Sequence, residues 1–276
     1  MTYIRPDRIE GALTALSAGP ATILAGGTDL YPATERPGLD GAIVDITSIS
    51  GLRGVEAGPD GVRIGAATTW SDIVSADLPG AFDGLKAAAR TVGAIQVQNA
   101  GTVGGNLCNA SPAADGVPPL LTLDAEVILV SLSGERRLRL REFLQGPRQT
   151  ALEPGEILAA VHIPRSSVSG QGAFEKLGAR AYLVISIAMV AVRVEWEAGL
   201  IRDAAVAVGS CSAVARRLTE IEAGLIGTTG AVSDEMVASA LDPIDDVRAD
   251  AAYRAHAASV MIRKAVAATN PVERRS

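Results

Sequence analysis

The chain has 276 residues, of which 48% are hydrophobic and only 3% aromatic, and its formal net charge is −6. This length allows one large domain or two to three small ones, with a core built mainly of Ala, Val, Leu and Ile. The acidic balance excludes nucleic acid as the main partner, because no basic excess is present to neutralise phosphates. Two isolated cysteines, Cys108 and Cys211, exclude a disulfide framework. They also exclude an iron–sulfur cluster held by this chain alone, which would normally need four thiolates.

Targeting and membrane signals are not expected in this sequence. Residues 1–7 lack the apolar region of a secretory signal. The longest apolar stretch, 181–192, is short of the roughly 20 residues that a helix needs to cross a bilayer. We therefore expect a cytoplasmic protein without a membrane span.

The first 55 residues predict a small α/β unit. Apolar residues at helical spacing predict a helix over 9–16, with Asp7 as its candidate N-cap. Residues 21–25 then read as a strand that ends at a glycine pair, and residues 42–46 as a second short strand.

Residues 56–165 predict a second α/β unit with a different rhythm. Pro59-Asp60-Gly61 is typical of a hairpin, and Thr69 begins a short capped helix. Apolar residues spaced along 82–92 predict a further helix. The segments 125–131 and 136–140 form a predicted hairpin, and the strand 157–163 is expected to close the unit.

The last part, residues 170–276, follows a segment of small polar residues, 166–172, that reads as a linker. The strands 187–195 and 200–208 are predicted to pair as a hairpin. Helices are predicted over 213–223, 233–241 and 250–268. Since most strands come in hairpins, antiparallel pairing should dominate, and the class is α+β. A Rossmann domain is disfavoured because no G-x-G-x-x-G opens a helix.

Two glycine-centred segments, Ala25–Leu30 and Gly101–Asn106, are the strongest functional signal. Paired glycines let backbone N–H groups converge without obstruction from Cβ atoms, so each segment predicts a turn that binds an anion. Thr28 and Thr102 would add hydroxyl donors. Either pair alone is also compatible with a simple tight turn. Neither segment carries the lysine of a P-loop, so ATP hydrolysis is not indicated.

With these segments the chain resembles the FAD-binding medium subunit of the molybdenum hydroxylases, the xanthine dehydrogenase and carbon monoxide dehydrogenase family. The resemblance is carried by residues 25–30, 102–115, 154–158 and 174–180, in the order and spacing of the family. It implies an FAD-binding domain of the vanillyl-alcohol-oxidase type, made of two α/β subdomains, followed by a C-terminal antiparallel sheet with helices. The cofactor-binding residues implied are Leu24, Ala25, Gly26, Gly27, Thr28, Asp29, Leu30, Thr102, Val103, Gly104, Gly105, Asn106, Asp115, Leu158 and Lys176.

The resemblance also implies individual roles. Asp115 would contact the adenosine half of FAD through a ribose hydroxyl, although read alone it fits a helix-capping aspartate. Leu158 would contribute a contact near the adenine or flavin. Lys176 would lie near the isoalloxazine ring, although read alone it resembles a surface lysine. An acidic residue that many relatives carry after the lysine segment is replaced here by residues 182–186, which leaves the electron acceptor and the roles of Tyr182 and Ile185 open.

No catalytic residues and no metal ligands are expected. His162 and His256 lie far apart in the sequence, and Cys211 has no neighbouring base. Cys108 reads as a small buried filler rather than a redox thiol.

The resemblance implies an oxidoreductase subunit that transfers electrons. A small subunit with 2Fe-2S clusters would pass electrons through FAD to NAD, oxygen or a quinone, and a large subunit would hold molybdopterin and oxidise a substrate that this sequence does not identify. The complex is expected to be a dimer of heterotrimers. Two other functions stay open: a self-contained FAD oxidase of a small alcohol or amine, and a non-catalytic assembly subunit.

Overall fold

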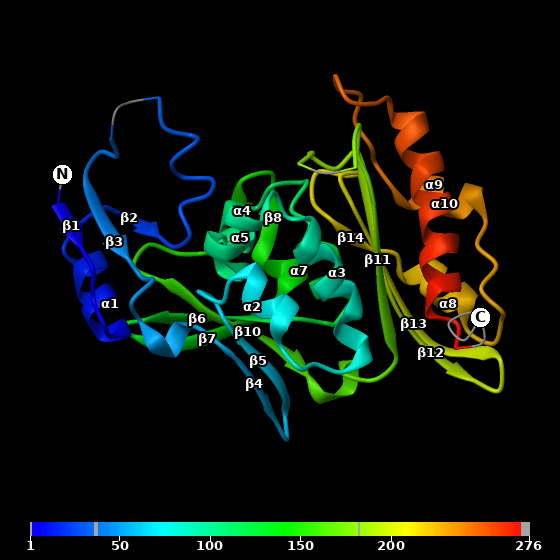
Figure 1. The fold of residues 1–276 in the computed structure, drawn as a ribbon, viewed down its shortest axis with the longest axis horizontal. Coiled ribbons are helices and arrows are strands. Elements are labelled where there is room, and N and C mark those ends of the chain that lie inside the picture. Colours follow the sequence, from blue (N-terminus) through cyan, green and yellow to red (C-terminus); the bar gives the residue numbers. More distant parts are fainter. Residues whose placement is uncertain (1, 36–37, 182, 272–276) are drawn as a thin grey trace.

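A computed structural model describes residues 2–35, 38–181 and 183–271 of the chain. Three main sheets and one two-stranded ladder follow one another along the sequence (Figure 1). They are formed by residues 2–45, 55–164 and 171–217, with the ladder inserted at 144–150. The predicted division into domains at 1–55, 56–165 and 170–276 stays a prediction. Tyr182, whose role the sequence left open, lies outside the described residues.

The first sheet is parallel and has the order β1-β3-β2. Its strands are β1 (Thr2–Ile4), β2 (Ala21–Leu24) and β3 (Ala42–Asp45), and the helix α1 (Ile9–Ser17) connects β1 to β2. The sequence missed β1, whose side chains are mostly exposed and give no alternating apolar signal. The proposed N-cap Asp7 is wrong. Arg8 occupies that position, and it makes no side-chain capping bond.

The second sheet is antiparallel and has five strands. In spatial order these are β4 (Val55–Gly58), β5 (Gly61–Gly65), β10 (Ile157–Pro164), β6 (Glu126–Ser131) and β7 (Gly134–Arg139). The strand expected to close the unit, β10, is its last strand along the chain and lies at the centre of the sheet, between β5 and β6. Its near-continuous burial fits this central place, because both of its edges are paired.

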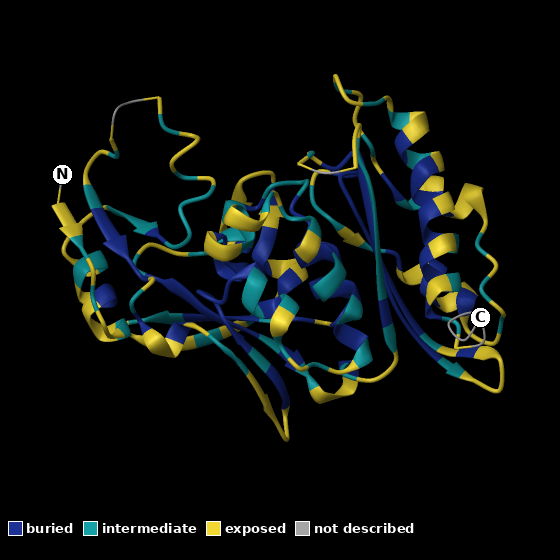
Figure 2. Ribbon diagram, in the orientation of Figure 1, coloured by how far each residue is buried: buried dark blue, intermediate teal, exposed yellow. Residues whose placement is uncertain are grey.

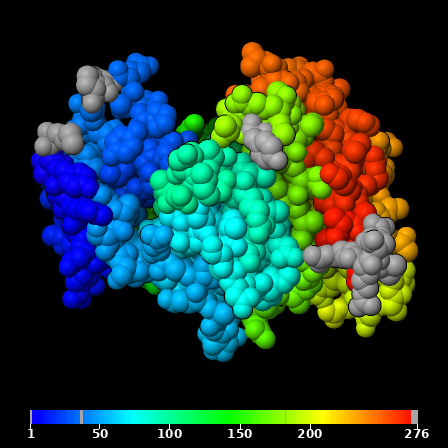
Figure 3. Space-filling view, viewed as in Figure 1, coloured from blue at the N-terminus to red at the C-terminus, as the bar shows by residue number. Residues whose placement is uncertain are grey.

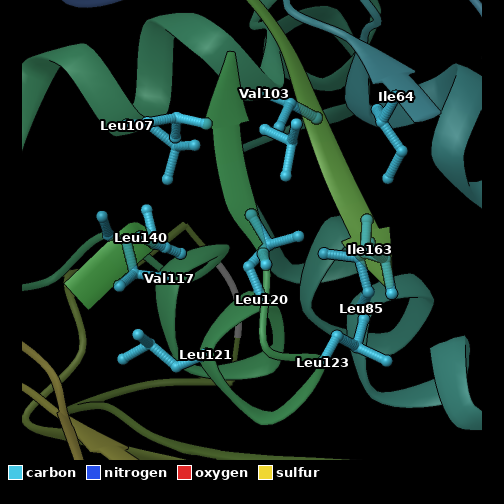
Figure 4. Packing of buried hydrophobic residues seen from close by; sticks show 14 of the residues in the cluster. Ile64, Leu85, Val103, Leu107, Val117, Leu120, Leu121, Leu123, Leu140 and Ile163 are labelled. Carbon is cyan, nitrogen blue, oxygen red and sulfur yellow. The ribbon is translucent and has the colours of Figure 1, made fainter. Parts of the chain in front are cut away.

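Short helices cover one face of this sheet. They are α2 (Trp70–Ser75), α3 (Asp83–Thr91), α4 (Ile95–Ala100), α5 (Val103–Asn109), α6 (Val117–Thr122) and α7 (Leu140–Phe143). Figure 4 shows Val103 and Leu107 of α5 pointing into a cluster with Ile64 and Ile163 of the sheet. Two of the few aromatic side chains, Trp70 and Phe82, are buried in the same cluster. Thr69 caps α2 as predicted, through a reciprocal capping box with Asp72.

The third sheet has the order β11-β12-β13-β14 and is antiparallel. Its strands are β11 (Gln171–Leu177), β12 (Ala188–Glu197), β13 (Leu200–Gly209) and β14 (Arg216–Arg217). The helices α8 (Thr219–Leu225), α9 (Asp234–Ala240) and α10 (Ala251–Thr269) lie on its outer face (Figure 1). Figure 2 shows α10 buried along the side that meets the sheet and exposed along the other.

Two expectations for this part are wrong. The predicted linker 166–172 contains a short 3-10 helix (Arg165–Ser167), and β11 begins within it at Gln171. The predicted helix over 213–223 begins only at Thr219, because Arg216 and Arg217 pair with β13 instead.

The third sheet packs against the second unit through glycine backbones. A Cβ on Gly172 would lie 2.4 Å from the carbonyl oxygen of Ala81, and one on Gly84 would lie 2.9 Å from that of Ala173. These approaches bring α3 onto β11, and Arg193 of β12 donates to the carbonyl of Thr122 at 3.1 Å. Most strand pairs of the chain are antiparallel, which confirms the α+β class.

Candidate functional site

A cavity of about 630 Å³ lies between the loop that follows β2 and the helix α5. Its volume is within the range of about 300–1,000 Å³ that is usual for cofactor sites. In Figure 3 the surface is notched where the blue N-terminal part meets the green-blue segment near residue 100. Predicted residues that line the cavity are Ala25, Gly26, Gly27, Thr28, Asp29, Leu30, Thr102, Gly104, Gly105, Asn106 and Leu158.

Four predicted residues do not line this cavity. Leu24 and Val103 are buried directly behind the two lining segments. Asp115 and Lys176 lie apart from it and form a pair described below.

The first glycine segment is a loop whose shape requires both glycines. A Cβ on Gly26 would lie 1.9 Å from the carbonyl oxygen of Ala100, so the loop touches the backbone before α5. Gly27 has a φ of +69°, a conformation that L residues seldom adopt, and a Cβ there would meet the ring of Tyr31 at 2.5 Å.

The amides of this loop are available to a ligand. Within the described ranges, the backbone N–H groups of Gly26, Gly27, Thr28 and Asp29 have no protein acceptor. Successive free N–H groups beside a cavity are the usual donors to phosphate oxygens. This loop therefore has the chemistry that the sequence predicted for it.

The second glycine segment forms the first turn of α5 rather than a loop, and several of its amides already donate within the protein. Its role in binding an anion stays a prediction. Gly105 N–H donates to Thr102 Oγ1 at 3.0 Å, Gly104 N–H to the Ala66 carbonyl at 2.8 Å, and Val103 N–H to the Thr68 carbonyl at 3.0 Å. Gly104 is needed for packing, since a Cβ there would lie 2.7 Å from the Cβ of Ala66.

Asn106 has a buried side-chain oxygen without a partner among the described residues. This oxygen is shielded from the cavity: it lies beside Gly116, where an added Cβ would be 3.0 Å from it, so Asn106 contributes only its other atoms to the cavity lining. The free amides of the Gly26–Asp29 loop, beside a cavity of this size, fit a polar, phosphate-bearing cofactor such as FAD.

Sequence reasoning misplaced one residue of this wall and missed another. Cys108, expected to be a buried filler, is accessible and lines the cavity. Protein atoms around the thiol desolvate it on its other sides and raise its pKa to about 12, so it is protonated at neutral pH. Arg148 also lines the cavity and donates to Asn109 Oδ1. The one sequence signal for Arg148 was the preceding Pro147, which marks a turn.

Asp115 and Lys176 form a buried ion pair that joins the second unit to β11. Lys176 Nζ lies 2.5 Å from Asp115 Oδ2, and Ser186 Oγ donates to Asp115 Oδ1 at 2.6 Å. Burial raises the pKa of Asp115, and the ammonium of Lys176 opposes that rise. The predicted roles place Asp115 at the adenosine half of FAD and Lys176 near its ring. Because these two side chains are in direct contact, the pair can face only one end of an extended ligand.

Comparison with known proteins agrees with this geometry. Residues 1–166 match the family model of the FAD binding domain in molybdopterin dehydrogenase, and residues 173–269 match that of the CO dehydrogenase flavoprotein C-terminal domain. The glyceraldehyde dehydrogenase medium chain of Sulfolobus acidocaldarius is 31% identical over 274 residues, covering 96% of each chain. The carbon monoxide dehydrogenase medium chain of Afipia carboxidovorans is 32% identical, covering 96% of this chain and 94% of the relative.

Solved structures agree as well. The chain superposes on one from the CO dehydrogenase of Oligotropha carboxidovorans with a TM-score of 0.89 at 28% identity, covering 100% of this chain and 98% of the other. The fold and the cavity thus define an FAD-binding flavoprotein with a C-terminal sheet and helices. The chain belongs to the family of FAD-binding medium subunits of molybdopterin dehydrogenases, which are oxidoreductases. In the described residues, no helix is long and apolar enough to cross a membrane.

Proposed function

We propose that this chain is the electron-transfer subunit of a heteromeric molybdenum hydroxylase. In this proposal electrons come from iron–sulfur clusters of a partner subunit and leave through FAD for an acceptor such as NAD, oxygen or a quinone. The observation that carries the proposal is the cavity, which has the row of free amides of Gly26–Asp29 on one wall.

The residues of the chain would divide the work of holding the cofactor. The N–H groups of Gly26–Asp29 would bind the diphosphate, and Thr28 would add a hydroxyl. Leu158 and the first turn of α5 would form the opposite wall, while Leu24 and Val103 hold these two walls from behind. When bound, the flavin supplies the ability to accept electrons one or two at a time.

The pair of Asp115 and Lys176 would act at one end of the cofactor. Lys176 is a buried cation, and a cation near the ring raises the reduction potential of a flavin because it favours negative charge on the reduced form. Asp115 holds the ammonium in place and is itself held by Ser186, so the pair would set the potential by its position rather than by moving a proton.

The cysteine content supports a division of labour among subunits. Two cysteines, one of them fully buried, cannot provide the four thiolates of a 2Fe-2S cluster. We therefore place the clusters in a small subunit and the molybdopterin in a large one, with a dimer of heterotrimers in the cytoplasm. Relatives named as a medium chain and as an FAD-subunit support the division of the complex into several subunits.

A visible spectrum of the purified chain, alone and together with its co-expressed partners, tests the proposal. We expect the flavin bands in the spectrum of the purified protein. We expect substrate to reduce the flavin, without added dithionite, only in the complete complex. Flavin reduction by a small alcohol or amine in the isolated chain would instead indicate a self-contained oxidase. Absence of flavin from both preparations would overturn the proposal.

A further inference from the structure

Arg148 occupies the tip of a hairpin that reaches the cavity. The strands β8 (Leu144–Gly146) and β9 (Gln149–Thr150) pair with Gly146 opposite Gln149, so Pro147 and Arg148 form the two-residue turn. Among the described residues that line the cavity, Arg148 is the only basic side chain and Asp29 the only acidic one.

The backbone of Arg148 is held in an unfavourable conformation. Its φ is +60°, and the sequence of a proline followed by a residue with positive φ is that of a type II turn. Glycine or asparagine is usual at this second position, because a Cβ is strained there. Strain of this kind that persists at a site is a reason to look for a function of the side chain.

The conformation is fixed from the end of α5. Arg148 N–H donates to the carbonyl of Ala110 at 2.9 Å, and its guanidinium donates to the side-chain oxygen of Asn109. Asn109 also lines the cavity, so this bond holds the guanidinium at the rim of the site while its remaining N–H groups stay available.

The charge of the cavity is incomplete without Arg148. A diphosphate brings two negative charges, and the free amides of Gly26–Asp29 supply only partial positive charge. A guanidinium is a planar donor that bonds phosphate oxygens in pairs. We propose that Arg148 binds a phosphate group of the bound cofactor, an inference that rests on the function proposed above.

Binding of FAD and of riboflavin to the full chain, followed by flavin fluorescence, tests this inference. Riboflavin carries no phosphate, so the two ligands separate a phosphate contact from a general effect on the cavity. Loss of one charge-assisted hydrogen bond should weaken FAD binding by about tenfold to a hundredfold in Arg148→Gln. Riboflavin binding should not change, and Arg148→Lys should recover part of the FAD affinity. Arg141→Gln is the matched control, since Arg141 is an exposed arginine outside the cavity lining.

The Arg148→Gly variant separates a role of the side chain in binding phosphate from a role in stabilising the turn. Glycine relieves the strained turn, so the melting temperature of the FAD-free chain should rise while FAD affinity falls as in Arg148→Gln. Unchanged FAD affinity in Arg148→Gln, or equal weakening of FAD and riboflavin, would overturn the inference and leave the proposed function intact. A wild-type chain that binds no FAD would overturn the proposed function and this inference with it.

Discussion

Gly26 is the position where one methyl group should separate the two walls of the cavity. In Gly26→Ala the new Cβ would lie 1.9 Å from the carbonyl oxygen of Ala100, 2.6 Å from its carbonyl carbon and 2.9 Å from the Cα of Gly101. Ordinary contact begins at 3.4 Å, so the closest pair must separate by 1.5 Å, the difference of the two distances. All three atoms are backbone, so no side-chain rotation relieves the clash.

The displaced segment leads directly into α5. The carbonyl of Gly101 accepts from Trp70 N–H at 3.2 Å, and the next residue, Thr102, caps α5. We expect overpacking of this kind to cost about 1–3 kcal/mol of unfolding free energy, which leaves the chain folded. FAD retention should nevertheless be lost, because the free amides and α5 would no longer face each other at the right distance.

The assay measures FAD per chain after gel filtration together with the urea midpoint of unfolding. Gly58→Ala is the matched control, since a Cβ at Gly58 meets nothing within 4 Å, and we expect full flavin content from it. Stoichiometric FAD in Gly26→Ala, or equal loss of FAD from Gly58→Ala, would show that the contact of Gly26 with Ala100 does not position the FAD-binding amides.

Three further predictions concern titratable groups. Lys176→Met leaves Asp115 buried without its cation and should lower the unfolding free energy by about 3–5 kcal/mol. Adding Asp115→Asn should recover part of this loss. As a control, Lys264→Met, at an exposed pair with Glu175, should change the urea midpoint little. Because the pKa of Cys108 is about 12, its reaction with iodoacetamide should become about tenfold faster for each pH unit between 7 and 10. Bound FAD should protect Cys108, and the buried Cys211 should stay unmodified. A reaction rate that FAD does not change would place the cofactor elsewhere. Hydrogen bonds from the backbone N–H of Arg248 and from Arg254 lower the pKa of Asp246 to about 2. The stabilising effect of the Asp246 carboxylate is therefore complete above pH 4 and lost as the pH falls toward 2. The urea midpoints of wild type and Asp246→Asn should converge over that range, and a constant difference between them would contradict this.

The regular parts of the fold were predictable because local pattern and burial agree there. Residues 200–208 are mostly apolar and pair with 190–197 as expected, and Asp250 caps α10 through Tyr253 N–H at 2.7 Å. The strand β11 was not predictable, because its sequence mixes small, apolar and charged residues without strict alternation and its conformation comes from pairing with β12. Arg217 likewise leaves the helical pattern because it pairs with Glu222 and with Asp124 far away in the sequence.

In the candidate site, too, features set by local sequence were predictable and features set by contacts between distant segments were not. The loop at Gly26 and Gly27 was visible in the sequence because only glycine suits its contacts and positive φ. Gly104 and Gly105 were misread as a second such loop, although Thr102 before them is a typical N-cap and marks the start of a helix. The pairing of Asp115 with Lys176 and the approach of Arg148 depend on packing between distant segments, which single-sequence patterns do not contain.

An experimental density map of the chain with FAD bound, at a resolution that places the diphosphate, would show which groups hold it. We expect phosphate oxygens within hydrogen-bonding distance of the N–H groups of Gly26–Asp29, in the cavity that α5 closes from the other side. A cofactor seated elsewhere on the chain, with those amides facing only water, would contradict this expectation.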